Sequence, residues 1–271
     1  MTDFHYFEAP TDTAAGTLNP VYELLDFPIV MNGADDIVLT GPSPDKPMVD
    51  GREVTDPRLV KALSKPVELD RAEVLDRSAK LGGILRAMGI IGTENERIVI
   101  AEDVPPIARA LSILGAVRIG ASVDVRSAAA SSVSSVSSVS AADTVSCADA
   151  TLSADTASSA DATSSANTAT ARLSARGVDD AITSVLVHTI DAPPINSGRA
   201  SVKVIRSRFE GVGITVAGET ANIDQAMRDS RVESAAVIPL APDRALIVTD
   251  QRALDAESSL EWLSQEILPG A

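Results

Sequence analysis

The sequence predicts an α/β fold with a parallel-type sheet and flanking helices, interrupted by a low-complexity segment. Residues 70–125 alternate helix, strand, helix and strand, which is the order expected of a parallel α/β sheet. Residues 172–271 again mix short apolar runs with helical patterns. The segment between them, 127–170, contains only Ala, Ser, Thr, Val, Asp, Leu, Asn and Cys.

A helix is expected over residues 70–88. Apolar residues recur there at helical spacing, with charged residues on the other faces. Asp70 is a suitable N-cap with Glu73 as its capping-box partner. Gly89 is a suitable stop, because glycine enters the left-handed conformation at little cost.

A strand, a helix and a second strand should follow. The run RIVIA at 97–101 predicts a strand, buried on both faces if the sheet is parallel. Prolines at the start favour a helix over 106–118, since a proline is tolerated in the first turn. Gly120 would end this helix and 121–125 would form the next strand. Before them, 41–57 is rich in proline and glycine and predicts a loop-rich connection.

Three regions are therefore expected: 1–126, a linker at 127–171, and 172–271, which continues the same domain. In the third region we predict strands at 185–187, 201–205, 214–216 and 245–249, and helices at 223–228 and 255–267.

The low-complexity segment carries a six-residue pattern, from ADTVSC at 142–147 onward. Such a period is known from parallel β-helices. Five hexads make fewer than two coils of about 18 residues, whereas about three repeats are needed for stability. The inward position would also be alanine, which buries little apolar area. A disordered, mobile linker is the favoured interpretation.

Composition excludes several classes of protein. The formal net charge of −15 disfavours nucleic acid and anionic membranes as partners. Cys147 is the only cysteine, so intramolecular disulfides and thiolate metal clusters are excluded. No apolar run approaches the roughly 20 residues of a membrane helix, and the N-terminus lacks a signal-peptide pattern. We therefore expect a cytoplasmic protein.

A succession of motifs gives a more specific indication. In order they read FHYF at 4–7, GTLNPVYELLD at 16–26, NGADDIVL at 32–39, VELDRAEVLDRSAKLGGILRAMGIIGTENERIVIA at 67–101, LSILGAVRIGASVD at 111–124, RGVDDA at 176–181 and SVLVHT at 184–189. This order resembles the N-terminal portion of short-chain acyl-CoA synthetases, the acetyl- and propionyl-CoA synthetases of the AMP-forming, adenylate-forming superfamily. The resemblance covers most of residues 4–125 and thins out after 190. It implies a partial adenylate-forming N-terminal domain, and ATP and CoA as cofactors.

The departures from that family concern its chemistry. The family holds ATP phosphates in a Ser/Thr/Gly-rich loop ending in lysine. The glycine-rich run at 211–218 lacks that lysine and is interpreted as strand and turn. The strand at 245–249 runs into Asp250, Gln251 and Arg252, where an aspartate would repel phosphate. The family's later nucleotide motifs, lid and adenylation lysine would lie beyond residue 271. The resulting expectation is a non-catalytic homologue, a pseudoenzyme with no catalytic residue.

One CoA-binding feature of the family has a partial match. The family uses an R-x-G-R segment, whose arginines serve the CoA phosphate by charge and forked donors. Here only Arg199, after Ser197 and Gly198, matches the second arginine, and Asn196 stands where the first would fall. Arg199 is thus a candidate contact to a CoA phosphate, with an ordinary surface arginine as the alternative.

Other chemistry finds little support. His5 and His188 are the only histidines, and the strand-like surroundings of His188 favour a structural imidazole over a metal ligand. Cys147 has no basic neighbour to lower its pKa. A G-x-S-x-G nucleophile motif is absent. The adjacent acids at 35–36 and 179–180 would diverge on a helix or strand and are interpreted as solvated turns.

Two further functions stay open beside the non-catalytic homologue. The chain would be one half of a split ligase if a ligase-like partner chain supplied the nucleotide site. An exposed apolar face is then expected, which self-association would also cover. The other alternative is a CoA- or acyl-CoA-binding module that uses Arg199.

Overall fold

The computed structural model describes residues 5–42, 48–49, 52–53, 55–125, 183–190, 207–229 and 231–269. These residues belong to one compact unit, built by the chain on both sides of the low-complexity segment. The predicted linker at 127–171, the predicted strand at 201–205 and Arg199 lie outside the described residues.

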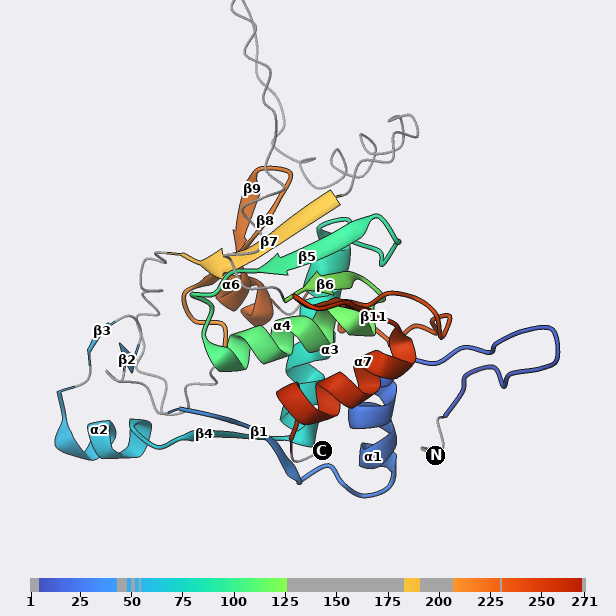
Figure 1. The fold of residues 1–271 in the computed structure, drawn as a ribbon. Helices are drawn as coiled ribbons and strands as arrows, with labels where there is room; N and C mark the ends of the chain where they lie inside the picture. Colours follow the sequence, from blue (N-terminus) through green and yellow to red (C-terminus); the bar gives the residue numbers. More distant parts are fainter. Residues whose placement is uncertain are drawn as a thin grey trace, which may run out of the picture. The chain divides into compact units, whose positions relative to one another are not determined.

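A seven-stranded mixed sheet organises this unit, so the predicted α/β class is confirmed (Figure 1). The strand order is β11-β10-β6-β5-β7-β8-β9. The seven strands are β5 (Glu96–Ile100), β6 (Ser122–Asp124), β7 (Thr183–Thr189), β8 (Val212–Val216), β9 (Glu219–Asn222), β10 (Ile247–Val248) and β11 (Ala253–Leu254). The chain segments before and after the low-complexity segment meet where β5 pairs with β7.

The predicted parallel arrangement is right in the centre of the sheet and wrong at its edges. Strands β10, β6, β5 and β7 are parallel, whereas β8, β9 and β11 pair antiparallel with their neighbours. Short turns explain the antiparallel β8–β9 and β10–β11 pairs, whereas the connection from β7 to β8, residues 190–211, is long. Strands β8 and β9 are joined by Ala217 and Gly218, both with positive φ (50° and 85°), as a two-residue hairpin turn requires. A parallel connection would need a crossover of a dozen or more residues.

Smaller antiparallel pairs lie outside the main sheet. Strand β1 (Ile37–Gly41) pairs with β4 (Val67–Asp70). Strand β2 (Met48–Val49) pairs with β3 (Arg52–Glu53), within the region predicted to be loop-rich.

The helices follow the predicted order closely. The helices predicted at 70–88 and 106–118 are α3 (Arg71–Ala87) and α4 (Pro106–Arg118), and the one at 223–228 is α6 (Ile223–Arg228). The helix predicted at 255–267 is α7 (Ala256–Trp262), continued by the π-helical turn η2 (Leu263–Ile267). Three further elements were not predicted: η1 (Tyr22–Asp26), α1 (Phe27–Val30) and α2 (Pro57–Leu63).

Helix α3 begins and ends at the residues from which its boundaries were predicted. The Asp70 carboxylate accepts a hydrogen bond from the backbone N–H of Glu73 at 2.7 Å. Gly89 has a φ of 90° just beyond the helix. The Glu73 carboxylate, however, pairs with Arg208 and Arg77 instead of closing a capping box. The helix start is thus capped from one side only.

The core lies between the sheet and its helices. Helix α4 packs on β5 and β6, α6 packs on β8, and α3 lies across both helices (Figure 1). The side chains of Ile98, Val123 and Val185 fill this interface and are almost fully buried. Helices α3 and α4 approach closely because Gly115 lacks a side chain: a Cβ atom there would lie 2.9 Å from the Ser78 carbonyl oxygen.

The two faces of the sheet are unequally buried. In β5, Ile98 and Ile100 are buried, whereas Arg97 and Val99 on the opposite face are half-buried. The prediction that this strand is buried on both faces is therefore wrong. Strand pairing places one continuous row of side chains across this second face, which we call the outer row: Ala253, Val248, Asp124, Val99, Leu186, Thr215 and Thr220.

Candidate functional site

Ligands of open α/β sheets bind beyond the carboxyl ends of the strands, where the strand order reverses. Here β6 follows β5 on one side, and β7 lies on the other side of β5. The reversal therefore falls at β5, and the segment after Ile100 lies at the expected position of a site.

Three adjoining cavities surround this carboxyl edge. The hairpin cavity, of about 400 Å³, lies between the β10–β11 turn and helix α7. The helix cavity, of about 370 Å³, lies beside α4. The loop cavity, of about 530 Å³, lies at the segment after β5. Trp262 lines the first two, Arg109 the last two, and Asp250 the hairpin and loop cavities, so the three lie next to one another.

The segment after β5 is held in place by polar contacts. The Thr189 hydroxyl, at the end of β7, donates a short hydrogen bond to the Asp103 carboxylate. One guanidinium nitrogen of Arg109 donates to the carbonyl oxygens of Ile100 and Ala101, at 3.4 and 3.2 Å. These bonds join the ends of two neighbouring parallel strands to helix α4.

The charge of the carboxyl edge is mainly acidic. The acidic residues lining the three cavities are Glu102, Asp103, Asp250, Glu261 and Glu266. The basic residues lining them are Arg109 and Arg252. The acidic residues outnumber the basic ones, and the Arg109 guanidinium already donates hydrogen bonds to backbone carbonyls. This edge therefore repels a polyphosphate more than it attracts it.

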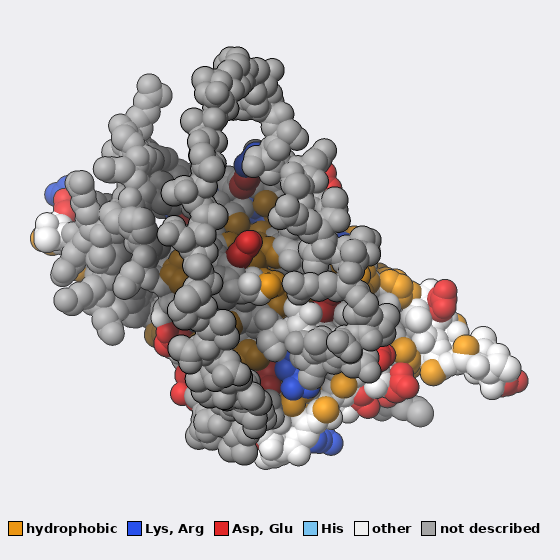
Figure 2. Space-filling view, turned by 90° about the horizontal axis from the view of Figure 1, so that it is seen from above, with side chains coloured by type: hydrophobic (Ala, Val, Ile, Leu, Met, Phe, Trp, Pro, Cys, Tyr) orange, Lys and Arg blue, Asp and Glu red, His pale blue; other side chains and the backbone are white. Residues whose placement is uncertain are grey.

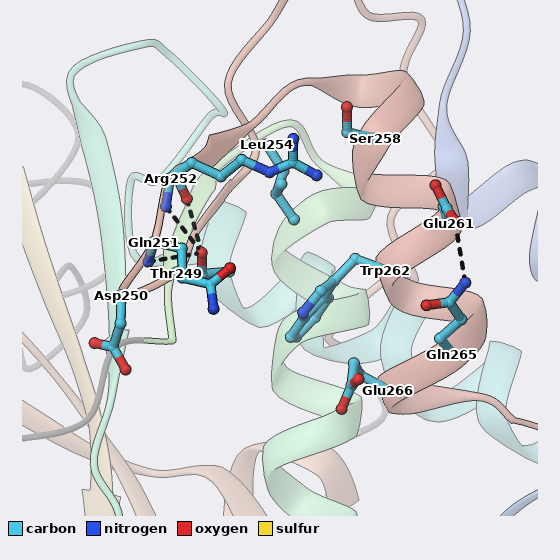
Figure 3. Close-up of a pocket in the computed structure, with 10 residues that line it drawn as sticks. All are labelled: Thr249, Asp250, Gln251, Arg252, Leu254, Ser258, Glu261, Trp262, Gln265 and Glu266. Carbon is cyan, nitrogen blue, oxygen red and sulfur yellow. Dashed lines mark hydrogen bonds between the residues drawn. The ribbon is translucent and has the colours of Figure 1, made fainter.

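The turn between β10 and β11, residues 249–252, is closed by its own threonine (Figure 3). The Thr249 side-chain oxygen accepts hydrogen bonds from the backbone N–H groups of Gln251 and Arg252, at 3.3 and 3.2 Å. It also donates to the Arg252 carbonyl at 2.9 Å. The Asp250 side chain points away from Trp262, whose indole projects from α7 toward the turn (Figure 3). Two amides that could face an anion are thereby used within the turn.

His188 and His5 lie in separate, satisfied environments. The His188 ring nitrogens bond to the Thr215 hydroxyl at 2.9 Å and to the Thr189 carbonyl at 2.8 Å. His5 bonds to Glu23 at 2.8 Å and stacks on Phe27. Both ring nitrogens of His188 thus have hydrogen-bond partners, as predicted for a satisfied imidazole. Within the described residues, no group of three or more His, Cys, Asp or Glu is arranged to hold a metal ion.

Other sequence predictions have clear outcomes. The glycine-rich run at 211–218 is strand β8 and its turn, as predicted. Asp35 and Asp36 are exposed at a turn, as predicted, and Asp36 also pairs with Arg71 at 2.7 Å. Arg199, Cys147 and the acids at 179–180 lie outside the described residues, so the structure does not test the CoA contact.

Sequence reasoning missed the hairpin cavity. Its signal was present: Trp262 is the only tryptophan in the chain, and it lies in the last predicted helix. Its relation to the turn at 249–252 depends on the tertiary fold and was not evident from the sequence.

Comparison with known proteins adds no relative. The sequence matches no protein-family model, and no curated protein matches it. None of the described helices has the length and apolarity to cross a membrane.

Proposed function

We propose that this chain is a non-catalytic relative of the short-chain acyl-CoA synthetases, one that does not form acyl-adenylates by itself. The motifs at 4–125 support the relationship. The observation that carries the absence of catalysis is the turn at 249–252, which occupies the end of a parallel strand at the carboxyl edge.

This turn has the wrong chemistry for a phosphate loop. Such a loop presents free backbone N–H groups and a lysine to the phosphates. Here Thr249 already accepts from the N–H groups of Gln251 and Arg252, and Asp250 adds a negative charge. A triphosphate beside this turn would have to displace those hydrogen bonds and would meet a carboxylate.

Pyrophosphate exchange into ATP tests the proposal directly. Purified full-length protein is incubated with ATP, labelled pyrophosphate and acetate, propionate or butyrate. We expect no exchange above the control without carboxylate. Carboxylate-dependent exchange that Asp250→Asn increases would instead mean that the nucleotide is bound at this edge, and the proposal would be wrong.

A second function, one half of a split ligase, is favoured by the outer row. Leu186 in this row is 41% exposed, and its neighbour Val99 is half-buried. Large apolar side chains on a sheet face typically pack against another layer of structure. Figure 2 shows further hydrophobic side chains exposed between charged ones on the face in view.

Solution mass shows whether the outer row is an interface between copies of this chain or is left for a different partner chain. Light scattering on the full chain, across a range of protein concentrations, measures self-association. If the outer row is an interface between copies, the chain associates, and Leu186→Lys shifts it toward monomer while Glu219→Lys at the sheet edge does not. If the chain is a monomer at every concentration, the outer row is not an interface between copies, and only a different chain could bind there.

A further inference from the structure

The hairpin cavity combines an aromatic floor with a polar rim (Figure 3). Its volume of about 400 Å³ lies within the range of ligand clefts, roughly 300–1,000 Å³. The indole of Trp262 is only partly buried, although it packs against the core. An indole offers a flat apolar surface and an N–H donor at its edge. The cavity therefore presents a stacking surface with one polar end.

Several rim side chains have unused hydrogen-bonding capacity. Within the described part of the chain, the side chains of Arg252, Gln251, Ser258 and Glu266 form no hydrogen bond or ion pair with the protein. Glu261 differs, because its carboxylate accepts a hydrogen bond from the Gln265 side chain at 3.1 Å. The free groups are thus available to a ligand.

These groups surround the indole with both donors and acceptors. Arg252 and Gln251 extend from the β10–β11 turn, whereas Glu266 extends from the helical segment on the other side of Trp262 (Figure 3). The lining carries one guanidinium, Arg252, against the carboxylates of Asp250, Glu261 and Glu266, so it repels an anion. Beside the indole, the free groups are one cationic donor and one anionic acceptor, since Asp250 points away (Figure 3). The complementary ligand is therefore neutral, with groups that both donate and accept hydrogen bonds. Hydroxyl groups have that property.

We propose that the hairpin cavity binds a neutral sugar ring, stacked on Trp262 and held at its hydroxyls by Arg252, Gln251 and Glu266. A pyranose has an apolar C–H face that matches the indole and a rim of hydroxyls that matches the side chains. A zwitterion should bind more weakly, because ion pairs in an exposed site contribute little. The inference is independent of the proposed relationship to acyl-CoA synthetases.

Because Trp262 is the only tryptophan, the fluorescence of the protein reports on this cavity. Selective excitation of Trp262 in the full chain is followed while the methyl glycosides of glucose, galactose, mannose and N-acetylglucosamine are added. We expect a saturable change with at least one glycoside, with a Kd on the order of 1 mM, because only a few hydrogen bonds and one stacked ring contribute. Glycine betaine and inorganic phosphate serve as zwitterionic and anionic probes, and neither should produce a saturable change.

Surface variants test which groups hold the ligand. Arg252→Ala and Glu266→Gln are each expected to weaken glycoside binding by about fivefold or more, the loss of one hydrogen bond to a charged group. Glu219→Gln, at the exposed edge of the sheet, should leave binding unchanged. Circular dichroism checks that each variant is folded.

Variants of Trp262 need a second measurement, because replacing the tryptophan removes the fluorescence signal. Saturation-transfer NMR on the glycoside should retain a weakened signal with Trp262→Phe and lose it with Trp262→Ala. No saturable response to any glycoside would overturn the proposal. So would a response to glycine betaine or phosphate that exceeds the response to every glycoside, or glycoside binding that Arg252→Ala and Glu266→Gln both leave unchanged.

Discussion

Arg118, the last residue of α4, and Asp26, the last residue of η1, form a bidentate ion pair across 92 residues of sequence. The guanidinium nitrogens lie 2.7 and 2.9 Å from the two carboxylate oxygens. The Nε–H group of the same guanidinium donates to the Ala235 carbonyl at 2.8 Å. Arg118 thereby connects the N-terminal helical segment, α4 and the chain near residue 235. Both charged residues belong to sequence motifs on which the proposed relationship rests, at 16–26 and 111–124.

Removing this guanidinium should destabilise the fold strongly. We expect Arg118→Ala to lower the free energy of unfolding by about 3 kcal/mol, because a mostly buried carboxylate and a carbonyl lose their partner. Urea denaturation followed by circular dichroism measures the effect. Arg231→Ala, which breaks an exposed pair with Asp229, is the matched control and should leave the midpoint almost unchanged. Equal midpoints for both variants would contradict a structural role for Arg118.

Glu96, at the start of β5, holds the preceding turn through one carboxylate oxygen. That oxygen accepts hydrogen bonds from the backbone N–H groups of residues 91, 92 and 93, at 3.1, 2.6 and 2.9 Å. Glu96→Ala should cost about 2 kcal/mol of stability, because three backbone donors in part-buried hydrogen bonds lose a charged acceptor. Hydrogen exchange should become faster at those three amides. Glu94→Ala, an exposed neighbour, should change neither quantity, and unchanged exchange in Glu96→Ala would contradict the interpretation.

Local signals explain why the sequence predicted helices α3 and α4 nearly to the residue. The cap at Asp70, the prolines at 105–106 and the left-handed glycines at 89 and 120 act over a few residues, so their effect does not depend on the rest of the fold. The strand after each helix was found for the same reason, since a short apolar run is also a local feature.

The features that escaped prediction depend on residues distant in sequence. Nothing near Arg97 indicates that its face of β5 would be less buried than the opposite face. The antiparallel pairing of β9 and β11 follows from short turns whose partner strands cannot be identified from a single strand. Trp262 forms a cavity only because the turn at 249–252 lies opposite it. The sequence therefore shows the residues of the candidate site but not that they line one cavity.

Gly83, in α3, is expected to be the most demanding glycine of the helix pair. A Cβ atom there would lie 1.8 Å from the Glu233 carbonyl oxygen, so backbone would have to move. We expect Gly83→Ala to lower the free energy of unfolding by about 3 kcal/mol through overpacking. Gly218→Ala is the control: its Cβ would meet open space, and only the left-handed conformation would cost about 1 kcal/mol. Thermal unfolding compares them, and a larger loss in Gly218→Ala would refute the close approach.

Asp229 should titrate at unusually low pH because of Arg231. The Arg231 side chain donates to both carboxylate oxygens, at 2.7 and 3.0 Å, and its backbone N–H donates at 2.9 Å. The side-chain hydrogen bonds, followed by the backbone one, lower the pKa of Asp229 from 3.8 to about 2. Carboxyl-carbon NMR should show this value in the native protein.

Arg231→Ala separates the two contributions to this shift. The pKa of Asp229 should rise toward its ordinary value but stay below it, because the backbone N–H of residue 231 remains. A lowered pKa in the folded state stabilises the fold above the unfolded pKa, near 4, and this contribution is lost as the pH falls from about 4 to about 2. The stability difference between native protein and variant should therefore narrow over that interval. It should be small throughout, since the pair is exposed. An Asp229 pKa that is the same in both proteins would show that the Arg231 side chain is not its cause.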